Sequence, residues 1–167
     1  MGALNFLVEG VTGTGKTSVC HELRRRGYDA VNGDTDLAIR LSPGLVPTSA
    51  EDVHGNHGWD ATLVRSLAAD RAARFTFFCG GSRNSASFLD VFDAVFVLEI
   101  DRATLLRRLD ARADDDWGST PEQRDLVLRL HATGDDVPPG MAIDATAPLE
   151  TVVDELLTAA KAFADRR

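Results

Sequence analysis

Eight consecutive residues near the start of the chain have the types and spacing needed to bind phosphate: Gly10-Val11-Thr12-Gly13-Thr14-Gly15-Lys16-Thr17. They match the pattern G-x-x-x-x-G-K-[ST], in which glycines let backbone N–H groups curl around a phosphate. Lys16 can reach the β- and γ-phosphates of a nucleoside triphosphate, and the Thr17 hydroxyl can ligate Mg²⁺. An apolar run (residues 4–8) precedes the motif, and a helical pattern (residues 18–26) follows it. The sequence therefore predicts a phosphate-binding loop between a strand and the positive end of a helix.

Two carboxylates, Asp34 and Asp36, follow the second predicted strand (residues 28–32). Because they stand two residues apart in an extended segment, their side chains point the same way. They could hold Mg²⁺, and one could accept a proton from an attacking hydroxyl. The alternative is that either residue caps a short helix over residues 37–41. With a phosphate loop upstream, we predict that both serve as metal and substrate ligands and that Asp34 is catalytic.

A second glycine-rich turn, Gly80-Gly81-Ser82-Arg83, follows the apolar run over residues 75–79. That run is typical of a strand buried on both faces. Two glycines at a strand end permit close approach of a ligand, and Arg83 is placed to meet an anion. We predict that this turn contacts substrate; a plain turn is the alternative.

Arginines mark the second half of the chain. Arg108 and Arg112 are four residues apart on a predicted helix (residues 102–112), so they share a face. Two cations on one face repel each other unless an anion lies between them, and Asp115 is the alternative partner to a bound phosphate. Arg124 lies on the polar side of the next predicted helix (residues 121–132).

The segment of residues 42–58 is rich in Pro, Gly, Ser and His, which predicts a loop or a short helical insertion. His54 and His57 have a spacing that suits a metal, but no cysteine or third histidine lies close by, so zinc is not expected. We interpret this segment as a mobile loop that faces substrate. Trp59 is expected in the core, as large aromatic residues usually are.

The order of elements indicates an α/β protein. Apolar runs (residues 75–79, 94–100 and 141–143) alternate with helical patterns (residues 60–74, 102–112, 121–132 and 149–164). Such alternation predicts a parallel sheet with helices on both faces. With 167 residues and no repeats or low-complexity tail, the chain is expected to form one domain over residues 1–167.

Composition narrows the class of partner. The net charge is −8 and the pI is about 4.9, which argues against a broad nucleic-acid or anionic-membrane surface. No apolar stretch approaches the ~20 residues of a membrane span, and no secretory leader pattern opens the chain. Cys20 and Cys79 are expected to be buried thiols. We therefore expect a cytoplasmic protein.

Taken together, the phosphate loop, the two aspartates and the strand-end glycines make the chain resemble the P-loop kinases of the nucleoside monophosphate and shikimate kinase group. The resemblance covers the whole chain in element order and length. It implies a three-layer fold with a five-stranded parallel sheet in the order 2-3-1-4-5. It also implies an acceptor-binding insertion (residues 37–74) and a lid segment (residues 113–120).

The resemblance also implies roles for individual residues. Asp34 stands where shikimate kinases keep an aspartate that meets acceptor and Mg²⁺, and Asp36 matches the second member of that pair. Gly80 and Gly81 match a glycine run that touches the acceptor. With ATP and Mg²⁺ as implied cofactors, the expected nucleotide-binding residues are Gly10, Thr12, Gly13, Thr14, Gly15, Lys16, Thr17, Ser18, Arg108, Arg112, Ala145 and Pro148.

The chain departs from shikimate kinases at the lid, which carries Asp114, Asp115 and Asp116 instead of an arginine. We expect Arg124 to supply the missing catalytic cation. No arginine aligns with the one that holds the acceptor carboxylate, and Arg65 or Arg83 is the expected substitute.

The sequence thus predicts an ATP-dependent kinase that acts on a nucleoside, nucleotide or polyol, as a monomer or homodimer. The alternatives are a nucleotide-binding regulatory protein without phosphotransfer and an ATPase; the acidic lid favours the former.

Overall fold

The computed structural model describes residues 3–167, which alternate between strands and helices along the chain. The elements are β1 (Leu4–Glu9), α1 (Lys16–Arg25), β2 (Asp29–Asn32), a π-helical turn (Gly33–Leu37), β3 (Ala38–Arg40), α2 (Ala50–Gly55), β4 (His57–Trp59), α3 (Ala61–Ala69), β5 (Phe75–Cys79), 3₁₀ turns (Ser85–Ser87 and Leu89–Val91), β6 (Ala94–Glu99), α4 (Arg102–Asp110), α5 (Pro121–Thr133), β7 (Met141–Asp144) and α6 (Leu149–Asp165).

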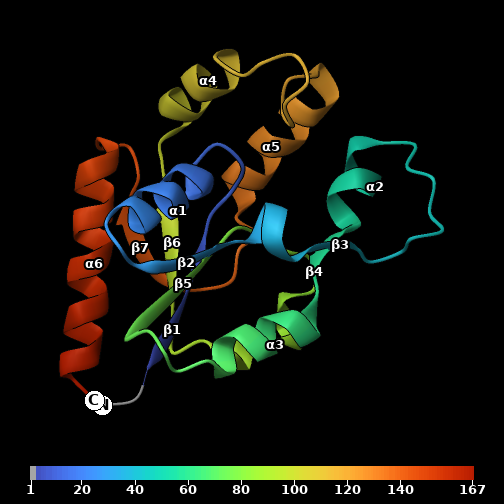
Figure 1. The fold of residues 1–167 in the computed structure, drawn as a ribbon. Helices are drawn as coiled ribbons and strands as arrows, with labels where there is room; N and C mark the ends of the chain where they lie inside the picture. Colours follow the sequence, from blue (N-terminus) through green and yellow to red (C-terminus); the bar gives the residue numbers. More distant parts are fainter. Residues whose placement is uncertain (1–2) are drawn as a thin grey trace.

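Five strands form the central sheet in the order β2-β5-β1-β6-β7 (Figure 1). All four pairings are parallel. Counted within this sheet alone, the order is 2-3-1-4-5, so the predicted topology is confirmed. Every residue of β1 and β5 is buried, because parallel strands in the middle of such a sheet are covered on both faces.

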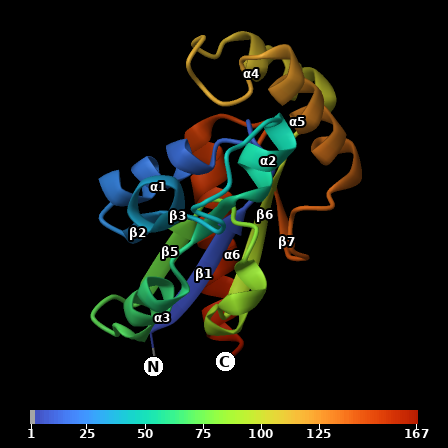
Figure 2. The same cartoon turned by 90° about the vertical axis from the view of Figure 1, so that its right-hand side faces the viewer.

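Helices cover the sheet on two sides, which gives three layers (Figures 1 and 2). On one side, α1 and α6 pack with α4 and α5 around the larger core, which includes Phe6, Leu23, Leu105 and Leu156. On the other side, α3 covers a smaller core in which the rings of Trp59 and Phe88 stack with their centroids 5.6 Å apart. In both views α2, α4 and α5 gather at the carboxyl ends of the strands, where ligands bind in open α/β sheets.

The segment after β2 differs from the prediction. No helix forms over residues 37–41; instead β3 pairs antiparallel with β4, so that Ala38 lies opposite Trp59. Trp59 is 1% exposed within the smaller core, as expected of a core residue. The predicted helix over residues 60–74 is also shorter. Capped by Asp60, α3 ends at Ala69, because Asp70 then accepts the Ala72 N–H in a turn toward β5.

Cys20 and Cys79 are both buried and free, as predicted. Among the helices within residues 3–167, none combines the length and apolar character needed to cross a membrane.

Candidate functional site

The glycine-rich loop forms a tight bend between β1 and α1, and α1 begins at Lys16. Gly10 opens the bend with φ of 151°, in the region that favours glycine, and a Cβ there would lie 2.8 Å from the carbonyl oxygen of Leu98. The Lys16 ammonium folds back over the loop and donates to the carbonyl oxygens of Gly10 and Val11, the latter at 3.0 Å. The local sequence thus gives the geometry of a phosphate cradle with its lysine at the centre.

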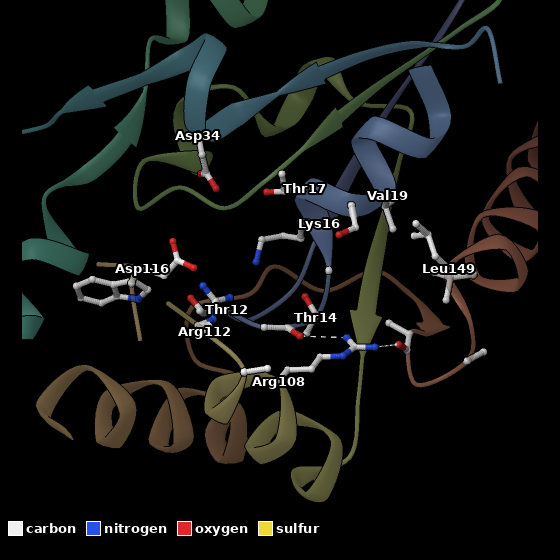
Figure 3. Close-up of a pocket in the computed structure, with 18 residues that line it drawn as sticks. Thr12, Thr14, Lys16, Thr17, Val19, Asp34, Arg108, Arg112, Asp116 and Leu149 are labelled. Carbon is white, nitrogen blue, oxygen red and sulfur yellow. Dashed lines mark hydrogen bonds between the residues drawn. The ribbon is translucent and has the colours of Figure 1, made fainter. Parts of the chain in front are cut away.

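A first cleft of about 590 Å³ lies beside this loop (Figure 3). Residues 12–19 form one wall, and Asp34 and Asp116 lie across from them. The lining also includes residues from α4, the segment after it, the turn between β7 and α6, and the start of α6: Arg108, Ala111, Arg112, Trp117, Ala145, Ala147, Leu149 and Val152. The cleft therefore combines groups that could bind phosphate with apolar side chains that could contact a base.

Arg108 ties two sides of the first cleft together. Its guanidinium donates to the carbonyl oxygen of Gly13 at 3.0 Å and to that of Ala145 at 2.7 Å (Figure 3). Burial lowers the pKa of Arg108, and Arg107 adds to this effect. Arg112 lies nearby, and its Nε is buried without a hydrogen-bond partner among residues 3–167. Arg112 is thus the cation at this end of the cleft that retains an unused donor.

A second, smaller cleft of about 370 Å³ adjoins the first. The two share four lining residues, which are Thr12, Lys16, Asp34 and Trp117. The second cleft is otherwise lined by Gly10, Val53, His54, His57, Gly81, Arg83 and Asp136. A molecule in either cleft would therefore meet the same lysine and the same aspartate.

Asp34 reaches both clefts from the π-helical turn after β2. The turn is capped by Asn32, whose side chain accepts the Asp34 N–H at 3.1 Å. His57 Nε2 lies 3.2 Å from Asp34 Oδ1, and this hydrogen bond lowers the pKa of Asp34, with a further contribution from the charge of Lys16. Asp34 is consequently an ionised carboxylate at neutral pH.

Asp136 forms the opposite wall of the second cleft, on the loop before β7. Its Oδ2 lies 3.1 Å from both His54 Nε2 and the Arg83 guanidinium, and Arg83 also donates to the Asp136 carbonyl oxygen at 3.1 Å. Burial acts to raise the pKa of Asp136, but the hydrogen bond from His54 and the charge of Arg83 outweigh it, so the pKa is lowered. The three side chains form a connected cluster that joins α2, the loop after β5 and the loop before β7.

Glu9, the last residue of β1, places a carboxyl group directly beneath the phosphate loop. It is 1% exposed, and its Oε2 accepts the Gly10 N–H at 2.9 Å. Burial raises the pKa of Glu9 to about 7, although the charge of Lys16 opposes the shift. Burial likewise lowers the pKa of Lys16, with the carboxylates of Glu9 and Asp34 opposing. The charges of Glu9 and Lys16 therefore partly offset the pKa shift that burial causes in each other.

Two side chains of the first cleft, Thr17 and Asp34, could hold Mg²⁺. Among residues 3–167 no cluster of three or more His, Cys, Asp or Glu side chains is arranged to hold a metal ion. Thr17 and Asp34 both line the first cleft, and a hydroxyl with one carboxylate fits the way Mg²⁺ is held alongside substrate phosphates and water.

Searches by sequence find no match among protein-family models or curated proteins. Solved structures, however, align over nearly the whole chain. A gluconokinase from Sinorhizobium meliloti 1021 covers 98% of this chain and 94% of its own, with a TM-score of 0.59 and 19% identity. A sugar kinase from Janibacter sp. HTCC2649 covers 93% of each chain, with a TM-score of 0.57 and 19% identity. The protein has the fold of the P-loop small-molecule kinases.

A shikimate kinase from Acinetobacter baumannii, in complex with shikimate, shares this P-loop kinase fold at a TM-score of 0.57 and 14% identity. The alignment covers 96% of this chain and 94% of the shikimate kinase. These likenesses confirm the predicted resemblance and fold class. At such identities they concern the fold, so the roles of individual residues depend on the geometry of the two clefts.

Several predicted site residues lie outside the lining of both clefts. Asp36 points to α1, where Arg24 binds it at 2.8 Å, and it also accepts the Asn32 N–H. Arg65 is held by Asp90 at 2.7 Å, and Arg124 by Asp110 at 2.6 Å. Gly80 packs against Trp59 behind Gly81, and Pro148 caps α6 between two residues that do line the first cleft. In this structure the charged ends of Asp36, Arg65 and Arg124 therefore meet other residues and do not line either cleft.

The structure also brings residues to the site that sequence reasoning missed: Glu9, Trp117 and Asp136. Glu9 carried a usable signal, since a charged residue rarely ends a fully buried strand. Asp136 carried none, because a Gly-Asp-Asp run before a strand reads as an ordinary turn. Trp117 stood within the predicted lid segment, but only the fold places it against His54, with the rings stacked at 6.3 Å.

Proposed function

We propose that this protein is a kinase that transfers the γ-phosphoryl group of ATP to a hydroxyl of a small molecule. One observation carries the proposal: Lys16 and Asp34 line both clefts, so a phosphate donor in the first and an acceptor in the second would meet at these two residues. The likeness to sugar and shikimate kinases supports the same class of reaction.

In the proposed reaction the backbone N–H groups of residues 13–17 and the Lys16 ammonium hold the phosphates. The hydroxyl oxygen of the acceptor bonds to the γ-phosphorus, and Asp34 accepts the hydroxyl proton. The bond between the γ-phosphorus and the oxygen bridging to the β-phosphate breaks, so that ADP leaves. Mg²⁺, when bound at Thr17 and Asp34, supplies charge neutralisation on the phosphates. Arg112, which lines the first cleft with a free donor, replaces Arg124 as the arginine that stabilises the transferring group.

The segments around the clefts suit this proposal. Residues 37–74 supply His54 and His57 to the second cleft, which fits an acceptor-binding insertion. Residues 113–120 supply Trp117 to both clefts, which fits a lid that keeps water from the γ-phosphate.

Replacement of Lys16 by alanine tests the proposal. We expect the Lys16→Ala variant to lose phosphoryl transfer by at least 100-fold, because removing a preorganised charge that faces the transition state costs about that much. The matched control is Lys161→Ala, which removes the only other lysine of the chain from an exposed position on α6. Transfer is followed by ADP release and by mass spectrometry of the acceptor, over a panel of sugars, polyols, nucleosides and nucleotides.

A specific observation favours a second function. Asp116 lines the first cleft and brings negative charge toward the phosphates, which suits a nucleotide-binding protein without transfer. If wild-type protein binds ATP but phosphorylates no member of the panel, this second function replaces the kinase.

A further inference from the structure

The second cleft contains an unusual combination of unused hydrogen-bonding groups. Asp136 and Arg83 are 11% and 17% exposed, and they bind each other through Asp136 Oδ2. Asp136 Oδ1 and Arg83 Nε are nevertheless buried without hydrogen-bond partners anywhere in residues 3–167. Buried polar groups in proteins are almost always paired, so one acceptor and one donor here call for a partner that the chain does not supply.

A hydroxyl is the group that satisfies both needs, because it donates one hydrogen bond and accepts others. A carboxylate or phosphate could accept from Arg83 Nε, but it would face the unpaired Asp136 oxygen without a proton to donate. An ammonium group could donate to Asp136, but it would leave Arg83 unpaired and add a second cation beside it. The pairing rules therefore favour neutral hydroxyls over either charged class.

The charges of the second cleft lead to the same result. Its lining carries two cations, Lys16 and Arg83, and two carboxylates, Asp34 and Asp136. Two histidines also line it, and each already contacts one of the carboxylates, His57 at Asp34 (3.2 Å) and His54 at Asp136 (3.1 Å). Once a donor nucleotide is bound, Lys16 is engaged by phosphate, and the charge of Arg83 is already paired through Nη1 with Asp136 at 3.1 Å. An anionic acceptor would then face two carboxylates while each cation of the lining already has an acidic partner, at a cost that grows in a partly buried site.

We propose that the acceptor is an uncharged polyhydroxylated molecule of about the size of one sugar ring, held by the Asp136–Arg83 pair while Asp34 meets the hydroxyl to be phosphorylated. This inference rests on the proposed kinase function and narrows its acceptor. A cleft of about 370 Å³ is at the small end of ligand sites (roughly 300–1,000 Å³), which suits such a molecule. Trp117 provides an apolar wall for the carbon face of a ring.

Matched pairs of acceptors test the proposal with the wild-type protein, ATP and Mg²⁺. The pairs are glucose with gluconate, myo-inositol with quinate, ribose with ribose 5-phosphate, and adenosine with AMP. We expect at least one neutral member to be phosphorylated with a kcat/KM at least 10-fold above that of its anionic partner. Preference for the anionic members overturns the inference and leaves the kinase function standing. No transfer to any of the eight compounds, with ADP binding intact, overturns both.

The Asp136→Asn variant tests the role of the pair, since it keeps the shape and removes the charge. We expect the KM of the neutral acceptor to rise at least 10-fold, the KM of ATP to stay within twofold, and discrimination against the anionic partner to weaken. Asp135→Asn, at the exposed neighbouring position, is the control and should change none of these values. Thermal unfolding verifies that both variants fold. An unchanged acceptor KM in Asp136→Asn refutes the assignment, and the acceptor panel remains decisive if the variant does not fold.

Discussion

Glu9→Gln should make the protein more stable, by an amount that grows as the pH rises. Glutamine has the shape of a protonated glutamate, and its side-chain oxygen can still accept the Gly10 N–H. It cannot ionise, however, so it avoids the cost of a charge that is 1% exposed beneath the phosphate loop. The substitution thus isolates the free energy of burying the Glu9 carboxylate.

The expected size follows from the pKa of Glu9, which burial raises from 4.5 to about 7. Because the raised pKa makes the folded state bind the proton more tightly, wild-type stability falls as the pH rises through this range. The cost of ionising Glu9 is about 1.4 kcal/mol at pH 5.5 and about 3.3 kcal/mol at pH 8, from 1.36 kcal/mol per pKa unit.

Urea unfolding at pH 5.5 and pH 8, followed by fluorescence of the buried Trp59, measures this difference. The free energy of unfolding of Glu9→Gln should exceed that of the wild type by about 2 kcal/mol more at pH 8 than at pH 5.5, with unchanged m-values. Glu155→Gln, on the exposed face of α6, removes the same charge and should show no such widening. A constant difference between Glu9→Gln and wild type would falsify the assignment of a raised pKa to Glu9.

Two further substitutions test the site and the packing behind it. Asp34→Asn should lower kcat by roughly 10²–10⁴-fold with little change in the KM of ATP, if Asp34 accepts the proton. Asp36→Asn is its control, since Asp36 faces Arg24, and an equal loss in both variants would contradict the assignment. Gly33→Ala should cost at least about 1–3 kcal/mol of unfolding free energy, because its Cβ would lie 2.0 Å from Trp59 Cζ2. Gly44→Ala, with open space around it, should be near neutral in the same urea titration, and equal stability of the two variants would refute the packing argument.

Patterns that are local in the chain were readable without the structure. The apolar run of β5, in which Thr76 is the one polar residue, indicates a strand buried on both faces. The spacing of Gly10, Gly15 and Lys16 dictates a loop that turns directly into a helix. The predicted start of a helix at residue 121 is confirmed, and Thr120 accepts the Gln123 N–H there.

Contacts between distant segments were not readable in this way. Asp34 and Asp36 look equivalent in the sequence, yet the π-helical turn sends one toward the clefts and the other to Arg24. The sequence likewise does not show that Asp110 lies 2.6 Å from the Arg124 guanidinium. In each case the partner of a charged side chain comes from a distant part of the chain, and the periodicity of the sequence does not reveal that partner.

The sequence by itself determined the glycine-rich loop that lines the first cleft. Such a loop is built from consecutive residues, so its backbone conformation and its lysine are encoded within eight positions. The second cleft was decided only by the tertiary structure. Asp34, Arg83 and Asp136 come from three loops that the parallel sheet gathers at one edge, and their mutual distances set which charges remain free to meet a ligand.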